Sequence, residues 1–438
     1  MIEKIEGRRP AWTRVPFQHF LLALGLIAVG GLFQAASAAT LCVNPQGTKG
    51  CFNTIQAAVN AAKASDAITV APGVYREDVT IKTPIALVGA NAGNTIIDAQ
   101  SMANGIYVDG LDNSGMGKIG LSGVVITGFT VENAEDEGIL VTNANDVTVS
   151  SNVVMNNDQT LHSKNGCQGL PSWELAESED CGEGIHISGV RHSIVSNNVV
   201  ESNAGGILLA DDTGATRDNL ITGNTVRNNP YDCGITLASH PNVAGAPPYG
   251  VSDNTISGNL SAHNGDADQG GAGVGIFDSV PHAKANGNRV IHNRLIGNSL
   301  PGVAMHSHAP NQQMRNTVIL GNYIAFNGAD TGQTETPGPA GINLFGVSPE
   351  LGTVISQNVI KGESIGIAVN TPAPVYVHLN NFSVSEFGVD NLGTAGTIDA
   401  TENWWGCSEG PSAEGCSSIG GTNVFSMPYL IQQFQPER

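Results

Sequence analysis

The chain has 438 residues, and only 13% of them are Asp, Glu, Lys or Arg, roughly half the usual proportion in globular proteins. Its 19 Lys and Arg residues stand against 39 Asp and Glu residues, so the formal net charge at pH 7 is −20. This charge repels nucleic acids and anionic lipids, and 55 glycines with only 5% aromatic residues are not the composition of a helical bundle.

Residues 1–38 have the pattern of a secretory signal peptide. A basic segment ends at Arg14, an apolar stretch of 14 residues runs from Phe20 to Phe33, and small residues at Ala36–Ala38 offer a cleavage site. The apolar stretch is too short for a comfortable membrane span, and no longer one follows. We therefore expect a secreted or periplasmic mature chain with no membrane-spanning segment.

Seven cysteines in an exported chain predict disulfides. Six of them form pairs that are close in sequence, namely Cys42 with Cys51, Cys167 with Cys181, and Cys407 with Cys416. The outer pairs would staple the two ends of the fold, and the middle pair would staple an inserted loop. Cys233 is left over, and a buried small apolar residue is the favoured interpretation over a reactive thiol.

Near the mature N-terminus, residues 54–63 (TIQAAVNAAK) have the pattern of an amphipathic helix. Ile55, Ala58, Val59 and Ala62 fall on one helical face. This predicts a short helix that covers the N-terminal end of the fold.

From residue 105 onward the chain repeats. A Gly followed by Ile or Val recurs with a shortest interval of 22 residues, as between Gly184 and Gly206. Its positions are Gly105, Gly138, Gly184, Gly206, Gly234, Gly275, Gly302, Gly341, Gly366 and Gly388. An Asn that begins Asn-x-Ile or Asn-x-Val precedes these marks at Asn152, Asn198, Asn224, Asn254, Asn293, Asn322 and Asn358, with Asn381 as a looser copy. Units this short cannot bury their own apolar faces, so neighbours must stack.

Stacked units of short β-branched strands predict an all-β chain, a single right-handed parallel β-helix in which each rung adds about 4.8 Å. An inward aliphatic ladder is expected from Ile185, Ile207, Ile235, Ile276, Val303, Ile342 and Ile367. The recurring Asn is interpreted as structural, because Asn tolerates a tight turn and bonds to its counterpart one rung away. The expected divisions are a cap and first coils over 39–104, β-helix repeats over 105–400, and a C-terminal cap over 401–438.

The C-terminal end carries two large aromatic residues, Trp404 and Trp405, between Asn403 and Gly406. Beside the last cysteine pair, they are expected to cover the final rung. A solenoid must hide its open ends in this way.

Several segments now support a resemblance. The stretch from Cys51 to Asp98, the Asn-x-Ile and Gly-Ile repeats, and the Asn-Trp-Trp-Gly ending resemble the right-handed parallel β-helix family of pectin-lyase-like secreted proteins. The repeats look like the carbohydrate-binding type shared by mannuronan C5-epimerases and NosD-like periplasmic proteins of copper-enzyme maturation. The resemblance covers nearly all of the mature chain. It implies the fold, which hosts lyases, hydrolases, epimerases and non-enzymatic modules alike.

The catalytic signatures of these families are not matched. The chain lacks the Tyr-Gly-Phe-Asp-Pro-His run expected of mannuronan epimerases. Of the pectate-hydrolase motifs, only Asp211-Asp212 is present, with no Gly-His-Gly after it. The resemblance therefore transfers no active site.

The repeat register supplies candidate residues instead. Counted from each Gly-Ile mark, the sixth residue is Asp212, His240, Pro281 or His308 in four consecutive rungs, with His282 next to Pro281. Stacking predicts one stripe of carboxylates and imidazoles suited to acid-base chemistry. The relatives of this fold imply that Arg315, Arg217 or bound Ca²⁺ would stabilise a substrate carboxylate. The candidate catalytic residues are Asp211, Asp212, His240, Asp278, His282, His306, His308 and Arg315. His306 and His308 point to the same side of a strand, so a Zn²⁺ or Cu²⁺ site with Asp278 or His240 is a further expectation.

Insertions at 259–273 and 327–340 are expected to wall a groove beside the stripe. A third insertion at 158–182 is expected to form a lid or a sugar-stacking edge at one end of this groove. The residues expected to contact a substrate there are His186, Arg217, Tyr231, Tyr249, Phe277 and Trp173.

Two functions stay open. The first is a carbohydrate-active enzyme, a lyase, epimerase or glycoside hydrolase, that binds an extended polysaccharide along the groove. It requires no cofactor by its sequence, although related lyases imply Ca²⁺. The second is a non-catalytic β-helix that binds a glycan, or a metal as NosD-like proteins do.

Overall fold

The structure is a computed structural model that describes residues 38–158, 182–240, 248–266, 270–278, 280–330, 336–393 and 396–435. Residues 1–37 of the predicted signal peptide, the Cys167 and Cys181 pair and Trp173 lie outside these residues. Within them, no helix combines the length and apolar character that crossing a membrane requires.

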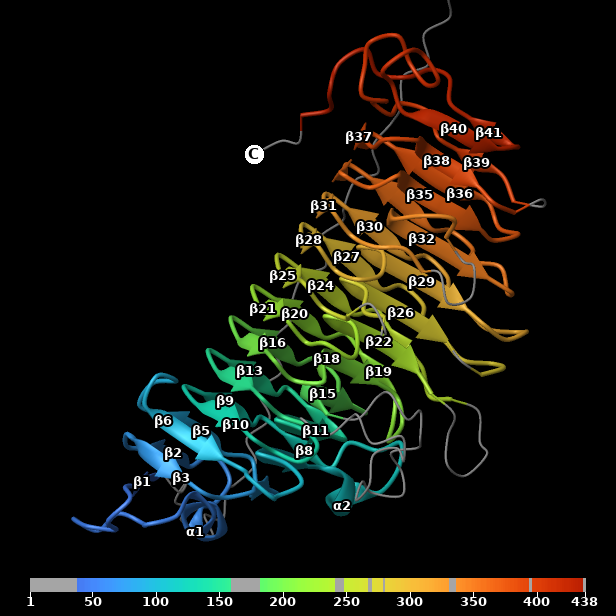
Figure 1. Ribbon diagram of the computed structural model, residues 1–438. Helices are drawn as coiled ribbons and strands as arrows, with labels where there is room; N and C mark the ends of the chain where they lie inside the picture. The colour runs from blue at the N-terminus through green and yellow to red at the C-terminus, as the bar shows by residue number, and fades with distance from the viewer. Residues whose placement is uncertain are drawn as a thin grey trace, which may run out of the picture. The chain divides into compact units, whose positions relative to one another are not determined.

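The chain from residue 38 winds into a right-handed parallel β-helix, as predicted. Three long parallel sheets run along the coil, with 14, 11 and 12 strands, and we call them sheets A, B and C. Figure 1 shows the strands stacked in chain order from the blue end to the red end.

Sheet A consists of β1 (Thr40–Val43), β2 (Ala67–Val70), β5 (Ala86–Gly89), β9 (Val125–Thr127), β13 (Thr148–Ser150), β16 (Ile194–Ser196), β20 (Leu220–Thr222), β24 (Thr255–Ser257), β27 (Arg289–Ile291), β30 (Val318–Leu320), β33 (Val354–Ser356), β36 (Val375–His378), β39 (Ile398–Asp399) and β41 (Val424–Phe425). Sheet B consists of β3 (Gly73–Tyr75), β6 (Thr95–Asp98), β10 (Thr130–Glu132), β14 (Val153–Met155), β17 (Val199–Glu201), β21 (Thr225–Arg227), β25 (Leu260–Ala262), β28 (Arg294–Ile296), β31 (Tyr323–Ala325), β34 (Val359–Lys361) and β37 (Asn381–Ser383).

Sheet C consists of β4 (Val79–Ile81), β7 (Ile106–Asp109), β11 (Ile139–Thr142), β15 (Glu183–Ser188), β18 (Gly205–Ala210), β22 (Ile235–Ser239), β26 (Val274–Asp278), β29 (Val303–Ser307), β32 (Ala340–Gly346), β35 (Ile365–Asn370), β38 (Phe387–Asn391) and β40 (Ser418–Gly421). Two further pairs join β8 (Leu121–Ser122) to β12 (Ala144–Asn145) and β19 (Thr216–Arg217) to β23 (Val251–Ser252). The helices are α1 (Ile55–Ala61) and α2 (Leu111–Ser114).

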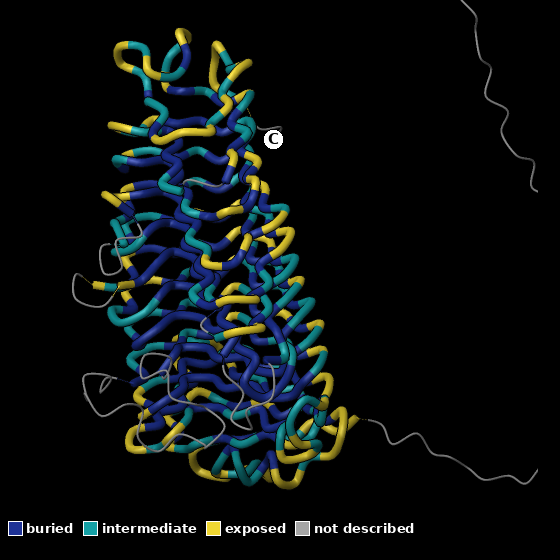
Figure 2. Tube along the Cα trace, turned by 90° about the vertical axis from the view of Figure 1, so that its right-hand side faces the viewer, coloured by how far each residue is buried: buried dark blue, intermediate teal, exposed yellow. Residues whose placement is uncertain are grey.

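The core of the coil is one continuous apolar cluster, because most strands direct alternate aliphatic side chains inward. In the tube of Figure 2, buried residues form the middle of the coil, and exposed residues gather at the turns. α1 covers the first rungs with Ile55, Ala58 and Val59, and Thr54 caps it by accepting from the amide of Ala57. At the other end, Trp405 is fully buried against Phe382, while Trp404 is half-buried.

The predicted disulfides Cys42–Cys51 and Cys407–Cys416 are both present, one near each end of the coil. Cys233 is a free, buried thiol, as expected. Burial raises its pKa well above the ordinary range, which keeps the thiol protonated.

The turns between sheets A and B are the most regular part of the coil. From β13 to β36 each turn has two residues, the first with a positive φ, as at Gly223 (66°) and Leu379 (60°), and the second an Asn. In each rung the Asn Nδ2 donates to the Oδ1 of the Asn in the next rung at 2.9–3.1 Å. The members of this A–B ladder are Asn152, Asn198, Asn224, Asn259, Asn293, Asn322, Asn358, Asn380 and Asn403. The structural interpretation of the repeated Asn is confirmed.

A second ladder connects sheets B and C and ends on an acid. It runs through Asn157, Asn203, Asn229, Asn264, Asn298, Asn327 and Glu363. Asn254 and Asn381, assigned to the A–B ladder from the sequence, are not members. Asn254 bonds to Asn219 and Asn288 at the corner before sheet A, five residues earlier than Asn259.

One rung of sheet C also differs from the expected register. Val274 pairs with Ile235 and Val303, whereas Ile276 pairs with Leu237 and Met305. The repeated Gly of this rung is therefore Gly273, not Gly275. Because side chains alternate with a period of two, a slip of two residues leaves the inward face unchanged, and the apolar pattern alone cannot detect it.

Candidate functional site

The outer face of sheet C is buried in the middle rungs, unlike the outer faces of the other sheets. All residues of β15, β18, β22 and β29 are buried. Strands of sheets A and B, such as β20 and β21, instead alternate a buried residue with exposed or partly exposed ones. Small apolar residues on the outer face of sheet C, including Leu208, Ala210 and Ala238, form clusters separate from the core. Polar side chains on this face are therefore held in a low-dielectric environment.

Three ionisable residues meet at the first of these rungs, and we call them the Glu–His cluster. Glu137 precedes β11, Glu183 begins β15, and His186 lies in the middle of β15. One ligand atom from each lies within 4.8 Å of the other two, and each residue is at most 1% exposed. His186 Nδ1 lies 3.0 Å from Glu137 Oε1. The rungs approach closely here, because a Cβ on Gly138 would lie 2.6 Å from the carbonyl oxygen of Gly184.

A second buried pair follows on the next rungs. His240, directly after β22, has Nδ1 3.1 Å from Asp212 Oδ1, and both residues are at most 4% exposed. Burial acts to raise the pKa of Asp212, but the imidazole of His240 and, more weakly, that of His186 hold this pKa below its usual range. The influence of His186 places the Glu–His cluster and the Asp212–His240 pair in one electrostatic field.

Asp211, next to Asp212, points into the coil instead. Its Oδ1 accepts the backbone N–H of His240 at 2.8 Å, and its Oδ2 accepts from Ser239 Oγ at 3.0 Å and from the amide of Gly250. Burial and the neighbouring Asp212 raise the pKa of Asp211 to about 6. Asp211 thus fixes the backbone of His240 from the interior side of sheet C.

Asp278 has the same inward orientation two strands further along sheet C, on β26, with Ser239 of β22 between it and Asp211. It pairs with Ser239 and Ser307, and its side chain is fully buried. Burial and the charge of Asp211 raise the pKa of Asp278 to about 8. The predicted stripe is therefore split, because residues at odd and even positions of a strand face opposite sides of the sheet.

His306 and His308 form an aromatic group on the outer face with Phe277 and Phe345. The ring of His306 lies 5.3 Å from that of Phe277 and 5.4 Å from that of His308, and His308 lies 5.8 Å from Phe345. Asn343 Nδ2 donates to His306 Nε2 at 3.0 Å. The proposed metal site with Asp278 is not assembled, because Asp278 points to the other side of the sheet.

The remaining predicted residues lie at the periphery. Arg217 contacts Asp218 at 2.5 Å, Tyr249 packs against Gly117, and the exposed His282 adopts a positive φ of 69°. The exposed Arg315 hydrogen-bonds through its backbone to Asn286. Burial, with the charges of Asp266 and Asp158 nearby, raises the pKa of the half-buried Tyr231.

Glu137, Glu183, Phe345 and Asn343 were missed by sequence reasoning. A signal for the first two was present, because Glu-Gly-Ile occurs at both 137–139 and 183–185. Candidate positions were counted from each repeated Gly toward the C-terminus, so the residue before each Gly was not considered. An insertion between the two marks also hid that they stand on adjacent rungs.

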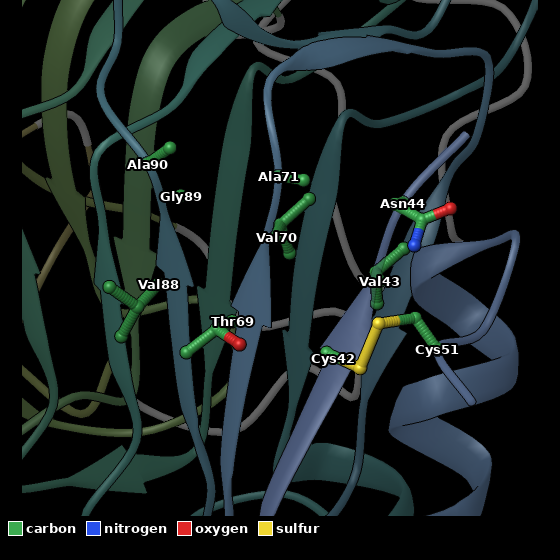
Figure 3. A pocket seen from close by; sticks show the side chains of 10 residues that line it. All are labelled: Cys42, Val43, Asn44, Cys51, Thr69, Val70, Ala71, Val88, Gly89 and Ala90. Carbon is green, nitrogen blue, oxygen red and sulfur yellow. A yellow bond between two sulfur atoms is a disulfide. The ribbon is translucent and has the colours of Figure 1, made fainter. Parts of the chain in front are cut away.

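A hollow of about 460 Å³ lies over the first rungs, beside the Cys42–Cys51 disulfide. Figure 3 shows its lining, which comes from β1, β2, β5 and the residues that follow them, among them Asn44, Thr69 and Val88. No acid, base or imidazole lines it. It is therefore separate from the candidate site.

The donor set of the Glu–His cluster, one imidazole and two carboxylates, suits a divalent transition metal such as Cu²⁺ or Zn²⁺. Among the described residues, a second compact group of possible ligands is Cys407, Glu409 and Cys416. Its two sulfurs are joined in a disulfide and offer no thiolate. The Glu–His cluster thus fits a metal, and the Cys group does not in this state.

Residues 73–348, which are 276 of the 438 residues, match the family model described as "Periplasmic copper-binding protein (NosD)". No curated protein sequence matches the chain. Solved structures with a similar fold include the A-modules of the Azotobacter vinelandii mannuronan C-5 epimerases AlgE4 and AlgE6. Both are 16% identical, with TM-scores of 0.47 and 0.49, over 79% and 80% of this chain and 94% of each module. Pectate lyase Pel9A is 15% identical, with a TM-score of 0.39, over 89% of this chain and 79% of that one.

Proposed function

The chain belongs to the NosD family of periplasmic copper-binding proteins, and we propose that it binds a divalent copper ion on the outer face of sheet C. The proposed ligands are Glu137, Glu183 and His186. The observation that carries this proposal is the convergence of their ligand atoms within 4.8 Å at a buried position.

The chemistry of these donors supports copper in its divalent state. Imidazole nitrogen and carboxylate oxygen are ligands that Cu²⁺ accepts, and Cu²⁺ binds such sites more tightly than other divalent first-row metals. When bound, the ion would supply two positive charges that offset two buried carboxylates. The side chains of the cluster come from adjacent rungs of a rigid sheet, so they would hold the ion without a large rearrangement.

Asp212 and His240 would not bind this ion but would influence the electrostatic potential at its site. Their pair lies in the same field as His186, as the pKa of Asp212 indicates. A carboxylate in this position would keep the local potential negative and favour cation entry. Export supports the same function, because two disulfides fit an oxidising compartment and residues 1–38 would direct the chain there.

The test is a Cu²⁺ titration of the metal-free protein by calorimetry and electron paramagnetic resonance. We expect one copper ion per chain, with hyperfine splitting from one imidazole nitrogen. His186→Asn should remove that splitting, and Glu183→Gln should weaken binding.

A matched control is His378→Asn. His378 pairs with Asp399 at 3.3 Å on sheet A and is about one-third exposed, so it offers the same residue types far along the coil. This variant should bind copper like the unmodified protein. Binding that survives in both Glu183→Gln and His186→Asn would refute the assignment.

A second candidate function rests on the Asp212–His240 pair. A buried His held by a carboxylate can serve as a general base, and Asp211 fixes its backbone. On this proposal His240 would abstract a proton from an extended polysaccharide, with Arg217 or bound Ca²⁺ near the substrate carboxylate. A carboxylate pair formed by Asp211 and Asp278 is less suitable, because both point into the coil.

Incubation with neutral and acidic polysaccharides, with and without Ca²⁺, tests this second function. Absorbance from unsaturated uronates together with new reducing ends would identify a lyase, and new ends alone a hydrolase. His240→Asn should abolish either signal while it leaves copper binding intact. Turnover that persists in His240→Asn would exclude His240 as the base.

A further inference from the structure

The interior of the coil contains a short column of polar side chains at the C-terminal ends of the middle strands of sheet C. It consists of Asp211, Ser239, Asp278 and Ser307, and we call it the inner column. Ser239 pairs with Asp278, Asp278 pairs with Ser307, and Ser239 Oγ donates to Asp211 Oδ2 at 3.0 Å. All four residues are at most 1% exposed. On each strand, the residue two positions before the member of the column is apolar and belongs to the core.

The neighbours of Asp278 are committed to other partners. Asp211 accepts from Ser239, from the amide of His240 and from the amide of Gly250. Ser307 Oγ donates to Gln312 Oε1 at 2.6 Å and accepts the amide of Ser348 at 3.2 Å. These bonds fix the walls around Asp278 and leave none of these groups directed at its carboxylate.

Asp278 itself is the exception in this network. Its side chain has no exposed surface, and neither Oδ1 nor Oδ2 has a hydrogen-bond partner. Its backbone carbonyl, by contrast, accepts from Gln312 Nε2 at 2.7 Å. No ion pair with Asp278 occurs among the residues that the structure covers. A buried carboxylate with no partner costs several kcal/mol, so native structures normally supply one.

We infer that Asp278 anchors a hard cation inside the coil, of the class of Ca²⁺, which the oxygens of Asp211 and Ser239 help to hold. All side-chain donors here are oxygens, which Ca²⁺ prefers and copper does not select. One dication would balance the two carboxylates. Ca²⁺ also tolerates irregular coordination, whereas Mg²⁺ demands a near-ideal octahedron.

A proton alone does not satisfy the site. A neutral acid still has a hydroxyl that needs an acceptor and a carbonyl that needs a donor, and neither oxygen of Asp278 has a hydrogen-bond partner. A cation contacts both oxygens at once. This site is distinct from the Glu–His cluster, because it lies on the other side of sheet C and uses no nitrogen ligand.

The inner site would also brace the outer one. Asp211 holds the backbone N–H of His240, whose ring pairs with Asp212 on the outer face. A cation that fixes Asp211 and Asp278 would therefore restrict the motion of His240.

The experiment uses the purified mature chain, stripped with EGTA and titrated with Ca²⁺ at pH 7.5 by calorimetry and thermal unfolding. We expect one Ca²⁺ per chain and an upward shift of Tm. Asp278→Asn should abolish both, and Ser239→Ala should weaken binding by about tenfold or more without a change of charge. Asp253→Asn makes the same substitution at an exposed position and should behave like the unmodified chain.

Three outcomes would overturn the inference. They are a stripped protein that takes up no Ca²⁺, an unchanged titration in both Asp278→Asn and Ser239→Ala, and a Tm that Ca²⁺ leaves unchanged. Should Asp278→Asn not fold, Ser239→Ala and calcium analysis of the unstripped protein decide the question. Copper titrations of the same samples separate the two sites, because Asp278→Asn should still bind copper and Glu183→Gln should still bind Ca²⁺.

Discussion

The turns between sheets A and B and the outer face of sheet C are built from the same rungs but follow opposite rules. At the A–B turns, every rung from β13 to β36 repeats one residue with a positive φ and one stacked Asn. On the outer face of sheet C, successive rungs present His186, Leu208, Thr236, Gly275, Ala304 and Asn343 at one position. The repeated corner holds the coil together, and the varied face is free to carry a site.

Burial separates the two regions as well. Both contain buried polar groups, but those of the A–B ladder are amides that satisfy one another without charge. The outer face of sheet C holds buried carboxylates and imidazoles, whose energies depend on partners and on pH. The buried ionisable groups on sheet C lower the stability of the coil. The uncharged Asn ladders, in which every amide is hydrogen-bonded, offset this loss.

The largest effect is expected from a break in the A–B ladder. Asn224 Nδ2 donates to Val195 O and Asn259 Oδ1, and Asn224 Oδ1 accepts from Asn198. Asn224→Ala leaves several buried groups without partners, each worth roughly 1–3 kcal/mol, so the free energy of unfolding should fall by at least about 3 kcal/mol. Urea denaturation followed by circular dichroism measures this.

The matched control is Asn94→Ala, at an exposed Asn outside the ladders, which should change the free energy of unfolding by less than about 0.5 kcal/mol. Equal losses in the two variants would show that the ladder is not what stabilises the coil.

A second prediction tests the buried outer face of sheet C. Ala304 has no exposed surface and packs with Cys233, Ala272 and Phe277. Ala304→Leu adds volume to a packed space and should destabilise the protein by about 1–3 kcal/mol. The same substitution on the outer face of sheet A, Ala86→Leu, should be nearly neutral because Ala86 is only partly buried. Comparable Tm values for both variants would contradict the difference between the faces.

The third prediction concerns the acid that ends the second ladder. Glu363 Oε1 accepts from the backbone and side chain of Asn327, and burial raises the pKa of Glu363 from 4.5 to about 7. Because the folded pKa is the higher one, the folded state retains the proton that the unfolded chain loses. The resulting stability is complete below pH 4.5 and is lost as the pH rises to 7, by up to about 1.4 kcal/mol per pH unit.

Glu363→Gln should remove this slope while its amide oxygen still accepts from Asn327. Unfolding free energies at pH 5, 6 and 7 measure the difference, and Glu402→Gln, at an exposed carboxyl, is the control. A parallel pH dependence in Glu363→Gln and the unmodified chain would show that Glu363 does not titrate as a buried acid.

The fold could be predicted from the sequence because its rules are local. A residue that tolerates positive φ, an Asn and a β-branched residue recur together, and each feature has one physical explanation. The repeated Gly and Asn were assigned to the wrong position where the same local pattern occurs twice within one rung. Gly273 and Gly275 fit the strand pattern equally well, and Asn254 and Asn259 both begin strands, so only pairing with neighbouring rungs decides between them.

The candidate site was only partly predictable for a related reason. His186, Asp212 and His240 were identified, yet Asp211 and Asp278 were placed with them although they face the interior. Counting residues from a repeat mark gives a position along the rung, but the side of the sheet depends on odd or even spacing within each strand. Glu137 and Glu183 were missed because each stands directly before the Gly from which the register was counted, and because a long insertion separates their two rungs.

The smallest loss of stability is expected from an exposed ion pair on sheet B, which can be compared with a buried pair on sheet C. On the outer face of sheet B, Arg227 Nε contacts Glu201 Oε2 at 2.7 Å across neighbouring rungs, and about half of the Arg227 side chain is exposed. Solvent screens such a pair, so Arg227→Ala should cost less than about 1 kcal/mol and the loss should shrink further in high salt. His186–Glu137 is also a pair across neighbouring rungs, but it is buried, so His186→Ala in metal-free protein should cost several times more and depend little on salt. Salt-dependent unfolding of the two variants measures this contrast, and equal losses would mean that burial on sheet C does not strengthen its polar contacts.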